Sequence, residues 1–176
     1  MNQKSKKPNN FAFIDSQNLN LGTQRMGWKL DWRKFRKYLR DKHNVGTAYM
    51  FIGYMSDNEA LYEYMHELGF LVVLKPTIDI SSNSQKDDGK SKPGEEKEKE
   101  KPIIKGNVDA ELVLYALKEM PNYDKAIIVS GDGDFFSLAE YLEEQGRLEH
   151  ILTPNWQYST LLKVFEEKII RLDQMR

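Results

Sequence analysis

The chain has 176 residues, of which 40% are hydrophobic and 30% are charged, and its net charge is −1. This length suffices for one domain with a sizeable core, and the near-zero charge argues neither for nor against a nucleic-acid partner. Because the chain has no cysteine, disulfides, thiolate catalysis and cysteine zinc sites are excluded, which fits a cytoplasmic location.

The N-terminal residues 1–10 are polar and carry lysines, and no hydrophobic segment follows them as it would in a secretory signal. We therefore expect a flexible tail there, followed by a single domain at residues 11–176. No hydrophobic run approaches the roughly 20 residues that a membrane-spanning helix needs, so we expect no membrane partner.

The first half of the chain alternates between hydrophobic runs and amphipathic segments, which is the pattern of β-α-β units on a parallel sheet. Strand, helix, strand, helix and strand are expected in turn at residues 11–15, 31–42, 48–54, 57–69 and 70–74. The first of these helices rests on the helical spacing of Trp32, Phe35 and Leu39.

The second half continues the same alternation. Helix, strand, helix and strand are expected in turn at residues 108–120, 125–130, 135–145 and 148–152. Ser159 or Thr160 can cap a last helix. The tail at 168–173 fits either an extension of that helix or an edge strand, and its periodicity does not decide between them.

The segment at about 80–102 differs from the rest, because it is rich in charge and almost free of hydrophobic residues. Such a composition buries too little surface to offset the entropy of ordering. We expect a disordered, charged insertion between the two halves of the domain.

Four acidic residues fall at one predicted edge of the sheet. Asp15 ends the first strand, and Asp132 and Asp134 follow the fourth strand. Asp109 lies in the first turn of the helix that precedes the fourth strand. Open parallel sheets bind ligands at the carboxyl ends of their strands, near the point where strand order reverses. Acids that converge there repel one another unless a cation joins them, and oxygen ligands suit Mg²⁺ or Mn²⁺.

Other residues near these acids fit a binding site. Asn18 lies one turn beyond the first acid, Ser130 adds a hydroxyl, and Lys105 can meet a phosphate or hold a carboxylate. Gly131 and Gly133 are expected to adopt positive φ and let the backbone pass close to a ligand.

Each residue also has a purely structural interpretation. Asp132 is a favoured turn residue, Asp134 and Asn18 are favoured caps, and Asp109 is favoured in a first helical turn by the helix dipole. Taken singly, these interpretations are preferred. Asp15 has little local use at the end of a buried strand, and the convergence of all four acids favours a metal site.

Three segments resemble the signature segments of the NYN domains, the PIN-like nucleases of the LabA-like group. They are FAFIDSQNLN, KGNVDAELVLYAL and AIIVSGDGDFFSLAEYLEEQGR, and the resemblance runs from Phe11 to about Leu172. It implies a three-layer α/β/α sandwich with a mainly parallel five- or six-stranded sheet of PIN-like, Rossmann-like topology.

The resemblance also implies a function, namely hydrolysis of RNA phosphodiester bonds by an acidic pocket that binds Mg²⁺ or Mn²⁺. The matching positions are Asp15, Asp109, Asp132 and Asp134 for the pocket acids, with Asn18 and Ser130 beside them. Ser16 stands where many relatives have glycine, and the insertion is long, which bears on substrate access. We expect one or two metal ions, with Asp15 and Asp132 as direct ligands.

Substrate binding requires positive charge, and the helix at 31–42 supplies it with Arg33, Lys37 and Arg40 at helical spacing. Aromatic side chains that could stack on bases of a single-stranded RNA are Trp28, Trp32 and Tyr38. The competing interpretation is a solvated amphipathic helix whose aromatic residues are core.

Several alternatives stay open. The same fold can act as an RNA-binding or regulatory module with little turnover. A phosphotransferase of the haloacid-dehalogenase type needs a second acid two residues after the first, where this chain has Gln17. A flavodoxin-like protein would need a glycine-rich phosphate loop after the first strand. No triad or zinc site is expected from the histidines, because their spacing does not fit one; they are His43, His66 and His150. A homodimer is compatible with the sequence.

Overall fold

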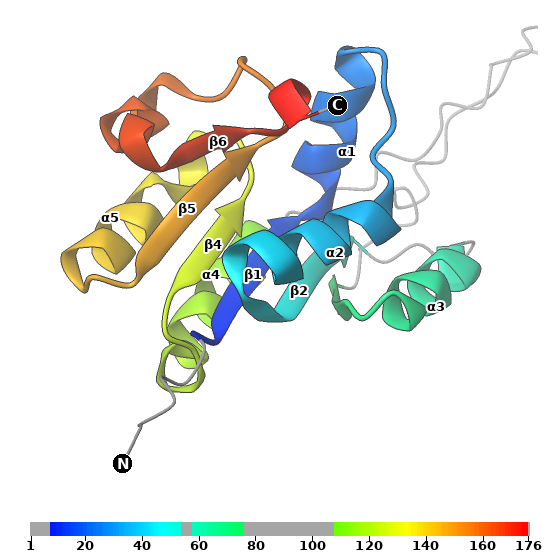
Figure 1. The fold of residues 1–176 in the computed structure, drawn as a ribbon, viewed down its shortest axis with the longest axis horizontal. Helices are drawn as coiled ribbons and strands as arrows, with labels where there is room; N and C mark the ends of the chain where they lie inside the picture. Colours follow the sequence, from blue (N-terminus) through cyan, green and yellow to red (C-terminus); the bar gives the residue numbers. More distant parts are fainter. Residues whose placement is uncertain (1–7, 54–57, 76–107, 176) are drawn as a thin grey trace, which may run out of the picture.

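The computed structural model describes residues 8–53, 58–75 and 108–175 (Figure 1). Most of the expected tail, the expected insertion at 80–102 and the predicted site residue Lys105 lie outside these ranges.

The centre of the molecule is a six-stranded sheet in which every neighbouring pair is parallel, in the order β3-β2-β1-β4-β5-β6. The strands are β1 (Asn10–Asp15), β2 (Val45–Gly53), β3 (Leu71–Lys75), β4 (Ala126–Val129), β5 (Leu148–Thr153) and β6 (Ile169–Arg171). The parallel sheet expected from the sequence is confirmed. The strand order reverses between β1 and β4, which is where ligands bind in such sheets.

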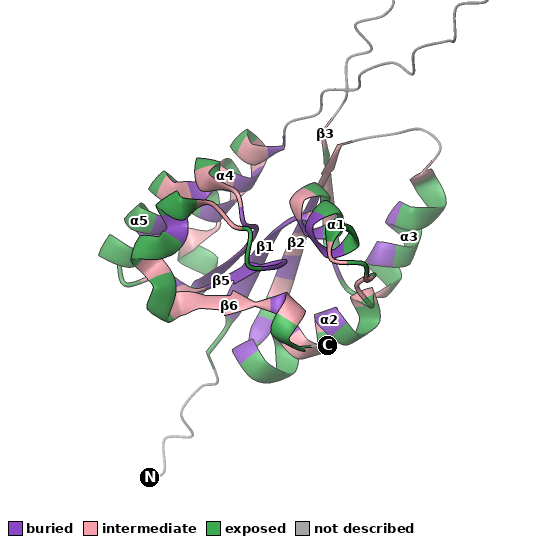
Figure 2. Cartoon of the chain, turned by 90° about the horizontal axis from the view of Figure 1, so that it is seen from above, coloured by how far each residue is buried: buried purple, intermediate pink, exposed green. Residues whose placement is uncertain are grey.

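Helices cover both faces of the sheet. The α-helices are α1 (Ser16–Arg25), α2 (Trp32–His43), α3 (Glu59–Glu67), α4 (Asp109–Lys118) and α5 (Phe136–Glu144). The 3₁₀ helices are η3 (Met120–Asn122), η4 (Gly133–Phe135), η5 (Thr160–Lys168) and η6 (Leu172–Met175). Figure 2 shows α4 and α5 on one side of the sheet and α1, α2 and α3 on the other, which gives three layers.

Strand β1 shows why the sequence folds this way. Its side chains alternate between two hydrophobic cores: Phe11 and Phe13 pack with α4 and α5, whereas Ala12 and Ile14 pack with the helices of the opposite face. A strand buried on both faces has a continuous hydrophobic sequence, and this is the origin of the FAFI run.

Helix α1 was not predicted. Its sequence, SQNLNLGTQR, is polar, and only Leu19, Gly22 and Thr23 are buried, so the helical period of hydrophobic residues is too weak to detect. The helix begins because the side chain of Asp15 caps it by accepting a hydrogen bond from the backbone N–H of Asn18, at 3.0 Å.

The C-terminal region decides two points that the sequence left open or placed differently. The expected last helix is a 3₁₀ helix, η5, with a kink at Phe165, where φ is −103° and ψ is 22°. Its start follows the prediction, because the Ser159 side chain caps it. The tail forms the edge strand β6, and its register places Ile169 beside Ile151 of β5.

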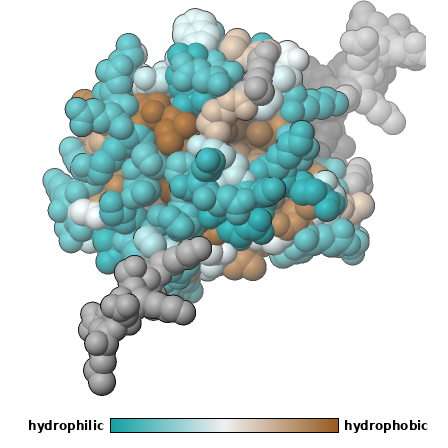
Figure 3. All heavy atoms as spheres, in the orientation of Figure 1, coloured by the Kyte–Doolittle hydropathy of each residue, from teal (hydrophilic) through white to brown (hydrophobic). Residues whose placement is uncertain are grey.

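The surface is hydrophilic over most of the face drawn in Figure 3, where hydrophobic residues appear as small separate spots. In the part of the chain that the structure describes, no helix combines the length and the hydrophobicity needed to cross a membrane.

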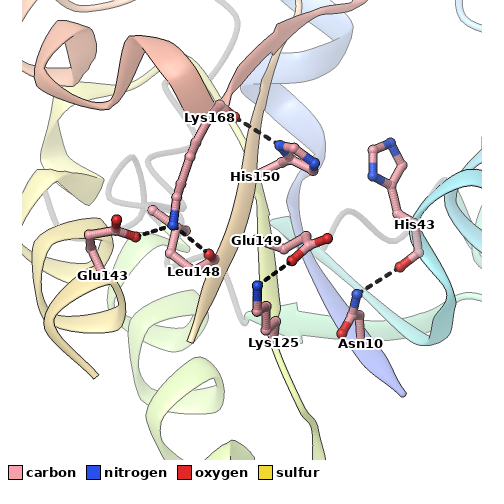
Figure 4. A network of polar contacts seen from close by, with 8 residues as sticks. All are labelled: Asn10, His43, Lys125, Glu143, Leu148, Glu149, His150 and Lys168. Atoms are coloured by element: carbon pink, nitrogen blue, oxygen red, sulfur yellow. Dashed lines mark hydrogen bonds and ion pairs between the residues drawn. The ribbon is translucent and has the colours of Figure 1, made fainter. Parts of the chain in front are cut away.

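Polar contacts gather between α2, α5, β5 and the last residue of η5, Lys168 (Figure 4). His43 ends α2 with 6% of its surface exposed, its Nε2 lies 2.8 Å from the Tyr38 hydroxyl, and its ring packs against His150 at 5.1 Å. Nδ1 of His150 lies 3.3 Å from the carbonyl oxygen of Lys168, whose amine pairs with Glu143. Both histidines therefore serve packing and hydrogen bonding in this structure.

Candidate functional site

The candidate site is built around Asp15, the last residue of the central strand β1. Only 5% of its surface is exposed. One carboxylate oxygen accepts the capping hydrogen bond from Asn18 N–H, and the other accepts a hydrogen bond from the Ser130 hydroxyl at 3.2 Å. These two bonds fix the carboxylate at the carboxyl edge of the sheet, where β1 and β4 end side by side.

The loop after β4 is tied to the same point. The Ser130 hydroxyl accepts a hydrogen bond from the Asp132 N–H at 3.1 Å, and the Asp132 carboxylate accepts one from the Asp134 N–H at 3.0 Å. The Asn18 amide oxygen accepts a hydrogen bond from the Gly131 N–H at 2.9 Å. In this structure, Asn18 therefore clamps the loops that follow β1 and β4 together.

Burial is the largest of the effects that raise the pKa of Asp15 above its ordinary value of 3.8. The negative charges of Asp109 and Asp132 raise the pKa further, while the hydrogen bonds from Asn18 and Ser130 oppose the shift. Asp109 and Asp132 therefore act on Asp15 through their charges, although the three acids come from different parts of the chain.

Asp134 differs from the other acids. It is exposed, and its contact with the loop is made by its backbone N–H. Asp134 is the second residue of the 3₁₀ helix η4, and the capping role that the sequence also allowed for it belongs to Asp132, which is the N-cap.

The oxygen-rich character of the site fits a hard divalent cation, because Mg²⁺ and Mn²⁺ prefer carboxylate ligands. Repulsion of Asp15 by two other carboxylates is what such a cation would relieve. Across residues 8–53, 58–75 and 108–175, no three Asp, Glu, His or Cys side chains are grouped closely enough to form a ready-made metal cage. Asp15 therefore interacts with Asp109 and Asp132 through charge, but the acids are not drawn together into a complete ligand set.

Ser16, the residue after Asp15, has a structural role here. Its hydroxyl donates a hydrogen bond to the carbonyl oxygen of Phe51 at 2.8 Å and so ties the start of α1 to β2.

The two glycines of the loop after β4 correct a sequence prediction. Neither Gly131 nor Gly133 has a positive φ. A Cβ atom at Gly133 would lie 2.4 Å from the Ser159 hydroxyl oxygen, and one at Gly131 would lie 3.1 Å from Cβ of Tyr158. The glycines are needed because another part of the chain packs against this loop.

That other part is the loop after β5, which the sequence analysis missed. Asn155 is 3% exposed, its amide donates to the carbonyl oxygen of Gly22 at 2.8 Å, and its oxygen accepts from Gln157 N–H at 2.7 Å. The N–H of Ser159 donates to the carbonyl oxygen of Gly131 at 2.9 Å. In Figure 1 this loop lies at the upper edge, near α1. A Pro-Asn pair after a strand was the available signal for an ordered turn.

The basic residues of α2 lie at different distances from the acids. The helix leads into the start of β2, so its last turn lies at the amino-terminal ends of the strands. Arg40 lines a hollow there with Val45 and Gly46, and its guanidinium donates to Asp41 at 2.9 Å. Arg33 is in the first turn, about 10 Å from Arg40 along the helix axis.

The strand order and the acids at the switch point define a Rossmann-like α/β protein. The crystal structure of a protein of unknown function from Vibrio parahaemolyticus has the same fold, with a TM-score of 0.72 and 22% identity, over 98% of this chain and 97% of that chain.

The model of the NYN domain family matches residues 11–172. The chain therefore belongs to the NYN domain family, as the sequence motifs indicated. It is also 22% identical, over 175 residues, to the "Low amplitude and bright protein LabA" of Synechococcus elongatus. The matched region covers 97% of this chain and 87% of that protein. Membership of this PIN-like family indicates nuclease chemistry at a coarse level.

Proposed function

We propose that the chain is a metal-dependent ribonuclease that hydrolyses phosphodiester bonds of single-stranded RNA at the carboxyl edge of its sheet. The observation that carries the proposal is the environment of Asp15, whose pKa is raised by burial and by the charges of Asp109 and Asp132. A buried carboxylate that is repelled by neighbouring acids destabilises the protein, and such perturbed groups gather at functional sites.

Each acid has a role in the proposal. Asp15 and Asp132 would hold the ion directly, and Asp109 and Asp134 would act through water or orient the attacking water. A bound Mg²⁺ or Mn²⁺ would supply the charge that polarises a phosphate oxygen and lowers the pKa of the attacking water. Ser130 keeps the first carboxylate oriented through its hydrogen bond.

Substrate attraction is assigned to basic side chains, because the net charge of −1 supplies no general attraction. We assign phosphate contacts to Arg33, Lys37 and Arg40 of α2 and to Lys105, with the largest share for Arg33. It lies in the first turn of α2, on the side of the carboxyl edge. Asn18 contributes by holding the two site loops together.

The direct test is cleavage of a mixed single-stranded RNA pool in Mn²⁺. Asp15→Asn and Asp132→Asn should each lower the rate at least about 100-fold, since each removes a proposed ligand. Glu63→Gln, at an exposed residue of α3, is the control for loss of a carboxylate and should cleave normally. Cleavage at the wild-type rate by the Asp15→Asn, Asp132→Asn double variant would contradict the proposal.

A second function, an RNA-binding or regulatory module with little turnover, is favoured by one observation. The described acids do not form a complete cage for a metal ion. This function predicts that the chain binds RNA and Mn²⁺ but leaves every RNA pool intact, whereas the ribonuclease cuts at least one of them.

A further inference from the structure

One exposed aromatic residue at the carboxyl edge has no part in the core. The chain has three tryptophans, and Trp28 and Trp32 are partly buried against the hydrophobic core beneath α2. Trp156 instead has 57% of its surface exposed, in the loop after β5. An indole that is more than half exposed stabilises the fold less by burial than a core aromatic does, and it leaves an apolar surface open to a ligand.

The backbone that carries Trp156 is held on both sides. The residue before it, Asn155, is buried and bonds to Gly22 of α1, and its oxygen accepts from the N–H of Gln157, the residue after. The hydroxyl of Thr153 adds a hydrogen bond to the Asn155 carbonyl oxygen at 3.2 Å. The backbone that carries the indole is thus held in place, so stacking of a flat ligand costs only the ordering of the side chain itself.

The loop is also joined to the segment that carries Asp132. Tyr158 packs against Gly131, and the next residue, Ser159, bonds to the Gly131 carbonyl oxygen at 2.9 Å. Trp156 is two residues from Tyr158, so its Cα lies within about 7 Å of that contact. Trp156 therefore lies in a loop at the same edge as the proposed catalytic acids.

The chemistry of the loop favours a base over a phosphate. Residues 154–158, with the sequence PNWQY, carry no charge. Phosphate contacts in nucleic-acid complexes come mainly from Arg, Lys and backbone N–H groups, whereas unstacked bases bind to aromatic faces.

We propose that Trp156 is a stacking platform for a base of the RNA strand, next to the phosphate that is cut. The inference rests on the proposed ribonuclease function and adds a substrate-binding residue to it. Because every base has a flat face, the platform selects unpaired strands over duplexes and tolerates different sequences.

The test measures binding of a fluorescently labelled oligouridylate, in an Asp15→Asn background so that strands stay intact. Trp156→Ala should weaken binding about tenfold, which is within the range for loss of one stacked base, and Trp156→Phe should retain most of it. Tyr141→Ala, at a residue of α5 that is 43% exposed, is the control for loss of an exposed aromatic and should bind normally.

A strand without bases gives the decisive comparison. An abasic oligomer of the same length and charge should bind the parent protein and Trp156→Ala equally weakly, and only the oligouridylate should quench tryptophan fluorescence in the parent. Measurable binding of oligouridylate that Trp156→Ala leaves unchanged would overturn the inference, while cleavage by the wild-type chain would leave the ribonuclease proposal standing.

Two further outcomes would also overturn it. If Trp156→Ala abolishes self-association in sedimentation experiments and leaves RNA affinity unchanged, the loop is a protein contact. If the parent binds no oligonucleotide and the wild-type chain cuts none, the inference and the ribonuclease proposal are both wrong.

Discussion

Asp15 at the end of β1 and His43 at the end of α2 are both nearly inaccessible, with 5% and 6% of their surfaces exposed. Burial acts against the charged form of each side chain, so it raises the pKa of the carboxyl and lowers the pKa of the imidazole. For the histidine this has little consequence near neutral pH, where imidazole is largely uncharged. For the aspartate the same burial opposes the form that neutral pH favours.

The neighbours of the two residues increase this contrast. His43 has the Tyr38 hydroxyl as a hydrogen-bond partner, and the negative charge of Glu149 offsets part of the effect of burial. Asp15 is repelled by two further acids. A buried group that is satisfied in its dominant form has a structural role, whereas one that is destabilised in its dominant form indicates a function that requires the charge.

The largest expected effect is stabilisation by a divalent cation. With Mn²⁺ at 100 times its dissociation constant, the free energy of unfolding should rise by about 2.7 kcal/mol, or about 5–10 °C in melting temperature. Asp15→Asn should remove most of this shift, because it removes the central carboxylate. Thermal unfolding with and without Mn²⁺ measures it, and an equal shift in both proteins would place the ion elsewhere.

A smaller effect is expected when EDTA removes free divalent ions, because Asp15→Asn should then make the protein more stable than the wild type. The raised pKa means that the folded chain favours protonated Asp15, so this group supports the fold fully below its ordinary pKa of 3.8 and loses that support as pH rises through the folded pKa. Asp15→Asn removes the charge and should raise stability at neutral pH by about 1 kcal/mol, or about 2–4 °C.

Asp132→Asn is the matched comparison for this second effect. Asp132 is only partly buried, and its oxygen also accepts the Asp134 N–H. Asp132→Asn should therefore raise the melting temperature less than Asp15→Asn does. A lower melting temperature for Asp15→Asn in EDTA would show that its hydrogen bonds outweigh the charge repulsion.

The sequence could place Asp15 and the Ser130–Asp134 segment at the carboxyl edge because the signals for their strands are local. The FAFI run identifies a strand that is buried on both faces, and the acid directly after it must lie at the carboxyl edge. The Ser130–Asp134 segment follows β4 in the same way. Once the parallel sheet is accepted, the shared edge follows from topology, whereas the distances between the side chains there do not.

The features that the sequence did not predict depend on contacts between distant residues. Asn18 bonds to Gly131, which is 113 positions away, and Asn155 bonds to Gly22 at a separation of 133. Gly133 is required by its approach to Ser159, so its conformation was predicted wrongly from local preferences alone. The pKa of a buried acid likewise depends on which residues meet in the folded chain.

The smallest expected effect concerns His43, the residue with which Asp15 is compared. The lowered pKa of His43 means that the folded chain favours neutral imidazole. The group supports the fold fully above its ordinary pKa of 6.5 and loses that support as pH falls through this value toward the folded pKa. The charge of His150 adds to this loss, and that of Glu149 opposes it.

His43→Gln should therefore flatten the fall in melting temperature between pH 7.5 and pH 5.5 by about 2 °C, since it removes a group that takes up a proton mainly in the unfolded chain. His66→Gln is the control, because His66 is exposed on α3, and it should leave the pH dependence unchanged. If both variants flatten the curve equally, burial of His43 has no effect on its proton affinity, and the contrast with Asp15 fails on the histidine side.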